Sequence, residues 1–108
     1  MYFALLNSLN NGILVLDVRG KICWANESAC RIIATNWKYL KNRDLSDFIA
    51  ETQVNEVSDS LGDCVKLGHN FTYRELQLIS GRSLSTTDAS FSKLEHSFDR
   101  VGSVLVEL

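Results

Sequence analysis

The feature that most constrains this fold is an apolar hairpin that leads directly into a helix, within residues 11–26. Residues 12–18 place aliphatic side chains on both faces of a strand, and such a strand lies inside a sheet, not at its edge. Gly20 tolerates the positive φ that a tight reversal needs, and Asn26 is of the type that caps a helix. This segment therefore predicts two paired strands followed by a helix that starts near residue 27.

The rest of the chain changes from helical to strand periodicity after Gly68. The predicted elements are a helix over 2–9, strands over 12–18 and 21–25, a helix over 27–35, short helical turns between 37 and 49, a helix over 52–67, strands over 71–80 and 83–91, a polar loop over 94–100 and a last strand over 101–108. Strand runs separated by a helical middle predict an α+β domain whose antiparallel sheet carries its helices on one face. The last strand is apolar on both faces, so we expect it to pair near the centre of the sheet.

Composition and charge narrow the choice of partners and compartment. The chain has 108 residues, the length of one domain, and a net charge of −2 with scattered basic residues, which disfavours nucleic acid and anionic membranes as partners. No apolar run approaches the about 18 residues of a membrane helix, and the N-terminus lacks the basic start of a signal peptide. Three cysteines without a CxxC pair suit a reducing compartment, so we expect a cytoplasmic domain. The abrupt end of the last apolar strand at Leu108 indicates a longer parent protein.

Several segments together carry a resemblance to a known family. They are Leu6-Asn7-Ser8-Leu9 before Gly12-Ile13-Leu14-Val15-Leu16-Asp17, then Trp24-Ala25-Asn26-Glu27-Ser28-Ala29, Gly68-His69-Asn70-Phe71-Thr72, Gly81-Arg82-Ser83 and Val104-Leu105-Val106-Glu107-Leu108. In these residues and in their order, the chain resembles the PAS domains. The resemblance implies a five-stranded antiparallel sheet in the order 2-1-5-4-3 with helices on one face. Residues 11–108 would form the PAS domain, and residues 1–10 a short flanking helix.

The match is closer to one branch of this family, the N-terminal PAS domain of nitrogen-regulation sensor histidine kinases of the NtrB type. Glu27 stands where such kinases often have a proline. The resemblance implies a two-component sensor kinase whose phosphoacceptor and ATP-binding regions follow this segment. The segment itself is then no enzyme, while the parent protein is an ATP-dependent protein-histidine kinase.

The residues offer no constellation for catalysis, a cofactor or a metal. The resemblance implies a His on the long helix in haem-binding relatives, but residues 52–67 contain none and His69 comes after them. Light-sensing relatives carry a reactive Cys in an Asn-Cys-Arg motif, whereas here Arg43 follows the Asn directly. His69 and His96 lack the spacing of metal ligands. We therefore predict no catalytic residue, no cofactor and no metal site.

Three further side chains can be interpreted either as structural residues or as chemically reactive groups. Cys30 and Cys64 fall at core positions of predicted helices, where free cysteines behave as small hydrophobes, and a redox role is the alternative. Asp17 ends the first strand, where its carboxylate is expected to accept hydrogen bonds from the turn. Acid–base chemistry is the alternative for Asp17.

Two functional interpretations remain open, and the first is a module that works by protein contact. Phe3, Leu6 and Leu9 form an apolar stripe, which a second copy would bury in a homodimer. The domain would then bias a helix that leaves after Leu108 toward the kinase region. An enzyme is the remaining class, and no residue set supports it.

The second interpretation is a sensor that binds a metabolite between the sheet and the helices. The strand over 83–91 has few large apolar side chains, so it could border a small polar cavity. The candidate lining residues are Trp24, Phe48, Leu61, Thr86 and Asp88. The alternative is that Trp24, Phe48 or Leu61 fills this space.

Overall fold

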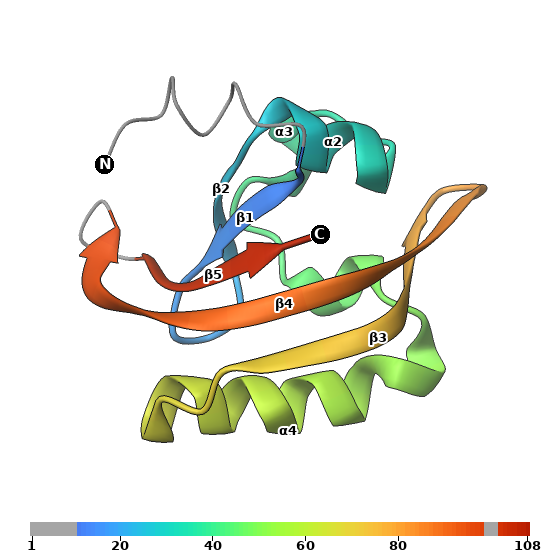
Figure 1. Cartoon of the computed structure of the whole chain (residues 1–108). Helices are drawn as coiled ribbons and strands as arrows, with labels where there is room; N and C mark the ends of the chain where they lie inside the picture. The colour runs from blue at the N-terminus through green and yellow to red at the C-terminus, as the bar shows by residue number, and fades with distance from the viewer. Residues whose placement is uncertain (1–10, 99–101) are drawn as a thin grey trace.

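The computed structural model describes residues 11–98 and 102–108, which form a sheet with helices packed against it (Figure 1). In chain order the elements are β1 (Ile13–Leu16), β2 (Ile22–Ala25), α2 (Glu27–Ile33), α3 (Trp37–Leu40), the 3-10 helix η1 (Leu45–Phe48), α4 (Glu51–Leu67), β3 (Phe71–Ser80), β4 (Ser83–Phe98) and β5 (Gly102–Glu107). The strands form one five-stranded sheet in the order β2-β1-β5-β4-β3. The predicted α+β class and strand order are confirmed.

β5, the last strand of the chain, lies in the middle of the sheet between β1 and β4. It pairs with β1 in an antiparallel register, and its side chains Val104 and Val106 are fully buried. Beyond the strand, the Leu108 N–H donates to the Gly12 carbonyl oxygen at 2.8 Å. The first and last described segments of the chain therefore lie side by side, as the apolar pattern of the last strand predicted.

Asn26 fixes the corner between the hairpin and α2. This side chain is fully buried, and its Oδ1 accepts from the backbone N–H groups of Ile13 and Ala29, each at 2.9 Å. Its Nδ2 donates to the Asn11 carbonyl oxygen at 2.9 Å. The predicted helix cap is confirmed, and the same amide also orients the start of β1.

The β1–β2 turn is built as its residues predicted. Gly20 adopts φ 86°, in the left-handed region that favours glycine. The Asp17 carboxylate accepts from the backbone N–H groups of residues 19 and 21, both at 2.9 Å, so its capping role is confirmed. β1 ends before Asp17 and not at Val18, because Asp17 already turns the chain and leaves Val18 62% exposed.

One hydrophobic core lies between the sheet and the helices. Phe91 of β4 is fully buried and stacks on Phe71 of β3, with ring centroids 4.4 Å apart. From α4, Val57 and Cys64 pack into the same core. Apolar burial contributes about 25 cal/mol per Å², so this layer dominates the stability of the fold.

β4 is longer than the sequence predicted. It runs to Phe98, so the polar loop expected over 94–100 is wrong for residues 94–98. The reason is pairing with β5, in which Lys93 lies opposite Val104 and Phe98 opposite Gly102. Strand formation depends on the partner strand more than on intrinsic preference, so polar residues join the sheet here.

The middle of the chain forms helices where its periodicity predicted them, in α2, α3, η1 and α4. The predicted helix at residues 1–10, with the candidate contacts Phe3, Leu6 and Leu9, lies outside the described residues. Of the helices in the described part, none has the length and apolar character to span a membrane.

Candidate functional site

A small cavity of about 50 Å³ lies between the β1–β2 turn, η1 and α4. Its lining combines apolar side chains, Leu45, Ile49, Val54, Val57 and Leu61, with the polar residues Arg19, Asp44, Ser46 and Ser58. A cavity needs roughly 10–15 Å³ to hold one water molecule. The space therefore suits a few waters, and a cofactor-sized molecule enters only if a wall moves.

One wall of this cavity, the β1–β2 turn together with η1, is fixed by backbone hydrogen bonds. The Leu45 N–H donates to the Gly20 carbonyl oxygen at 3.1 Å, and the Ile22 N–H donates to the Arg43 carbonyl oxygen at 2.9 Å. The Arg43 side chain also pairs with Asp47 at 3.1 Å, but both side chains are about half exposed and the pair adds little stability. The backbone bonds make this wall a single unit.

The opposite wall is α4, whose first turn is attached to β3. The Ala50 N–H donates to the Gln77 carbonyl oxygen at 3.0 Å. The Gln53 side chain accepts from the Gln77 N–H at 2.8 Å and donates to the Glu75 carbonyl oxygen at 3.0 Å. This end of α4 is thus held to the sheet by a backbone hydrogen bond and by both polar atoms of the Gln53 amide.

Two titratable groups lie where α4 meets the sheet. The Tyr73 hydroxyl donates to Glu56 Oε2 at 3.3 Å. Desolvation, together with the negative charge of Glu56, raises the pKa of Tyr73. Burial likewise raises the pKa of the Cys64 thiol, although the nearby Lys93 lowers it. Both groups stay protonated near neutral pH, so neither acts as a nucleophile there.

The five residues predicted to line a pocket do not come together at this cavity. Of them, only Leu61 belongs to its lining. Phe48 is buried in the hydrophobic core, and Trp24 is half-buried on β2, opposite Val15. A ligand contact by these side chains stays a prediction.

Thr86 and Asp88 are exposed and lie on the outer face of the sheet, the face turned away from the helices. The alternation along β4 explains this position, because Ala89 and Phe91 are fully buried and occupy the side that faces the core. The Asp88 side chain bonds to the backbone of the neighbouring strand β3. Its Oδ1 accepts from the Glu75 backbone N–H at 2.9 Å.

The polar residues of the cavity were not predicted from the sequence. Arg19, Asp44 and Ser46 come from the turn and η1, and no spacing in the sequence links them to α4. The apolar stripe of α4, which includes Val57, was the one available signal for the helical wall. Three-dimensional packing alone brings the two sets together.

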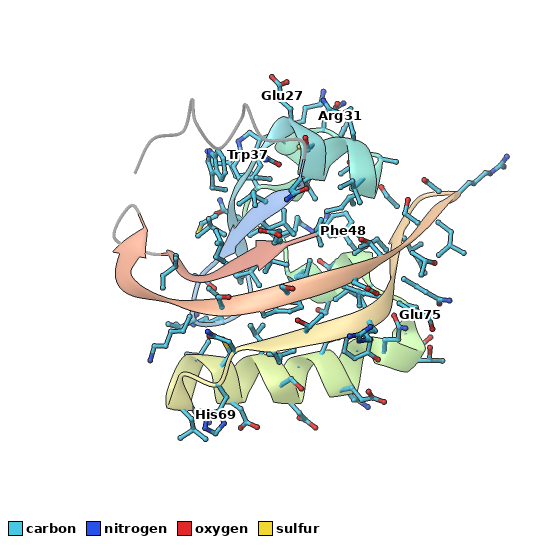
Figure 2. The ribbon with its side chains drawn as sticks, in the orientation of Figure 1. Glu27, Arg31, Trp37, Phe48, His69 and Glu75 are labelled. Carbon is cyan, nitrogen blue, oxygen red and sulfur yellow. The ribbon has the colours of Figure 1, made fainter. Side chains whose placement is uncertain are left out.

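A wider and more open hollow of about 450 Å³ lies on the surface between the end of β2, α2 and α3. Glu27, Arg31 and Trp37 border it (Figure 2). The Arg31 guanidinium donates to Ser28 Oγ at 2.9 Å. Burial and the Glu27 carboxylate raise the pKa of Cys30, which also lines the hollow, against the lowering effect of Arg31. The Cys30 thiol is therefore protonated and weakly reactive near neutral pH.

Within residues 11–98 and 102–108, no group of three or more His, Cys, Asp or Glu side chains is placed to hold a metal ion. His69 lies exposed just past the end of α4 (Figure 2). The candidate sites in the described part of the chain are thus the small cavity beside α4 and the open hollow between β2, α2 and α3.

The strand order and the helical layer define an α+β domain built from one sheet with helices against it. The family model described as PAS fold matches residues 1–88. The chain therefore belongs to the PAS family. Among proteins with curated descriptions, no sequence matches this chain.

Solved structures share this fold at low sequence identity. The PAS domain of nitrogen regulation protein NR(II) from Vibrio parahaemolyticus is 18% identical, with 97% of this chain and 93% of that chain covered and a TM-score of 0.70. A PAS domain from a two-component sensor histidine kinase is 15% identical, with coverage of 97% and 88% and a TM-score of 0.76. The PAS domain of the Cronobacter turicensis quorum-sensing receptor RpfR, in complex with BDSF, is 11% identical, with 93% of each chain covered and a TM-score of 0.73. At these identities the likeness shows the fold.

Proposed function

We propose that this chain is the sensory domain of a cytoplasmic two-component sensor histidine kinase, of the NtrB type that serves nitrogen regulation. It acts by contact, as a homodimer that passes its state to a kinase and phosphoacceptor region of the same protein. The observation that carries this proposal is the central position of β5, whose end at Leu108 bonds to Gly12. A change in the segment before residue 11 can thus reach the segment after β5 without crossing the whole sheet.

Two solved structures with the same fold support this proposal. PAS domains of the same fold occur in nitrogen regulation protein NR(II) and in a two-component sensor histidine kinase. The net charge of −2 favours protein partners over nucleic acid or anionic lipid.

Phe3, Leu6 and Leu9 are the proposed dimer contacts. Their burial between two copies would contribute about 25 cal/mol per Å² of apolar surface. Analytical ultracentrifugation at rising concentration tests this proposal. We expect a dimer for the natural chain and a monomer for the variant with all three residues changed to Ser.

The control is Leu67→Ser, which removes an apolar side chain that is 63% exposed at the end of α4. This variant should dimerise like the natural chain. A natural chain that stays monomeric at every concentration contradicts the proposed dimer.

A second function, small-molecule sensing, is favoured by the cavity beside α4 and by the relative that was solved with BDSF. Native mass spectrometry of the purified chain tests it. A retained small molecule supports sensing, whereas an empty domain supports the contact function alone.

A further inference from the structure

The edge strand β3 contains a β-bulge opposite Asp88. The register with β4 shifts between Tyr73 and Leu76, so that Arg74 and Glu75 together stand opposite Asp88. Glu75 adopts φ 56°, a left-handed conformation that residues other than glycine rarely take. Such a conformation persists only where its surroundings hold it in place.

Two side chains hold Glu75 from different sides. Asp88, on the outer face of the sheet, accepts from the Glu75 N–H at 2.9 Å. Gln53, in the first turn of α4, donates to the Glu75 carbonyl oxygen at 3.0 Å and accepts from the Gln77 N–H at 2.8 Å. Its amide takes the place that a peptide group of a further strand would occupy at this edge. Figure 2 shows Glu75 beside the first turns of α4.

The same part of α4 borders the small cavity. Val54 follows Gln53 directly and lines the cavity, and Ile49 both lines it and forms a bridge to Leu78 of β3. The opposite wall is joined to β2 by backbone hydrogen bonds. A molecule larger than the cavity of about 50 Å³ has to displace one of its two walls, and a displacement of the first turns of α4 pulls on the hydrogen bonds of Gln53.

We propose that the bulge at Glu75 couples the first turns of α4 to the outer face of the sheet, with Gln53 and Asp88 as positioning residues. When α4 shifts, Gln53 releases Glu75 and Gln77, and the left-handed Glu75 relaxes. The Asp88 carboxylate then loses its backbone partner on the exposed face. A free carboxylate thus marks the shifted state on a surface that a protein partner can reach. This step rests on the proposed sensory function and describes how its site is regulated.

Amide hydrogen exchange followed by NMR tests the coupling in both directions without a ligand. Asp88→Ala should speed exchange at Gln77 and at Val54–Val57 by about tenfold, within the range usual for coupled sites. Gln53→Ala should speed exchange at the Glu75 amide by a similar factor. This amide N–H donates its hydrogen bond to Asp88. The proposal requires that Asp88→Ala affects α4 and that Gln53→Ala affects Glu75, because a coupling free energy acts equally in both directions.

Two variants serve as matched controls. Asp88→Asn keeps the Oδ1 acceptor and should restore natural exchange rates. Thr86→Ala removes another exposed side chain from the outer face of β4 and should leave them unchanged. Exchange at Leu16 of β1 reports opening of the whole fold and should stay within about twofold. The proposal is overturned if Asp88→Ala speeds exchange at Glu75 alone, or at Leu16 as much as in α4.

A titration with decanoic acid, a molecule larger than the cavity of about 50 Å³, separates this coupling from the sensing function. Amide shifts at Ile49 and Val57 that extend to Glu75 support both. Shifts confined to Ile49 and Val57 overturn the coupling and leave sensing intact. A titration without any shift counts against small-molecule sensing alone, and the exchange rates of the variants still decide the coupling.

Discussion

Asn26 shows how a single buried amide determines the geometry of a corner of this fold. We expect Asn26→Ala to lower the free energy of unfolding by about 2–4 kcal/mol, because the N–H groups of Ile13 and Ala29 lose their acceptor in a buried place. Urea unfolding measures the change. Asn55→Ala, at an exposed position of α4, is the control and should cost less than about 0.5 kcal/mol. Equal losses in the two variants would contradict the structural role of Asn26.

Cys64 makes stability depend on pH. Burial raises the pKa of its thiol above the ordinary value of 9.0, so the folded chain holds this proton more tightly than the unfolded chain. The contribution to stability is complete below the pKa of the unfolded thiol, and it is lost as the pH rises through the folded pKa. We expect urea midpoints to fall above about pH 8.5 and to fall less steeply in Cys64→Ala. Parallel slopes in the two proteins would show that Cys64 titrates normally.

Among the elements, α2 ends in a conformation that its sequence does not favour. Ala34 caps the helix with φ 65°, and its N–H donates to the Arg31 carbonyl oxygen. The residue is exposed, so Ala34→Gly removes strain without leaving a cavity. We expect a gain of about 0.5–1 kcal/mol in the free energy of unfolding, measured by thermal denaturation. Ala50→Gly is the contrast, because Ala50 is buried at φ −55° and should lose stability. A loss in both variants would mean that the end of α2 is not strained.

The elements that the sequence predicted well are those with local signals. The apolar stripe and the stop at Gly68 define α4, and Gly68 indeed ends it with φ 71°. Asp17 and Asn26 were predictable for the same reason, since each bonds to backbone groups close by in the chain or at the next element. The extension of β4 to Phe98 could not be predicted in this way, because the pairing is supplied by β5, a strand that comes later in the chain.

The candidate site was harder to predict because it depends on which face of each strand turns inward. Period-two alternation shows that Thr86 and Asp88 share a face, but it does not say which face meets the helices. The bulk of Phe91 decides this, since its ring fills the core against Phe71. The role of Asp88 at the bulge has no local signal, because Glu75 lies on the neighbouring strand and its left-handed conformation belongs to a bulge in the pairing of β3 with β4.

For the molecule as a whole, the main constraint is that the last strand closes the middle of the sheet. β5 joins the β2–β1 hairpin to the β4–β3 hairpin, so neither half forms a five-stranded sheet without it (Figure 1). The contact between Leu108 and Gly12 places the two ends of the described fold next to each other. Gly12 has no room for a side chain, since an added Cβ would lie 2.9 Å from Ile32 Cδ1 and 3.2 Å from Leu108 Cβ. Tight packing at this junction therefore accompanies the closure of the sheet.

This closure predicts that the chain tolerates circular permutation at one place and not at another. Residues 82–108, joined through a short Gly-Ser linker to residues 11–81, keep every strand intact and open only the β3–β4 turn, where a Cβ on Gly81 would meet no atom within 4 Å. We expect native circular dichroism and cooperative urea unfolding. The matched permutant opened between Leu14 and Val15 cuts β1, which pairs with both β2 and β5, and should not unfold cooperatively. If the two permutants unfold alike, the chain order of the central strands does not limit folding. The junction at Gly12 then contributes no more to the stability of the fold than the β3–β4 turn does.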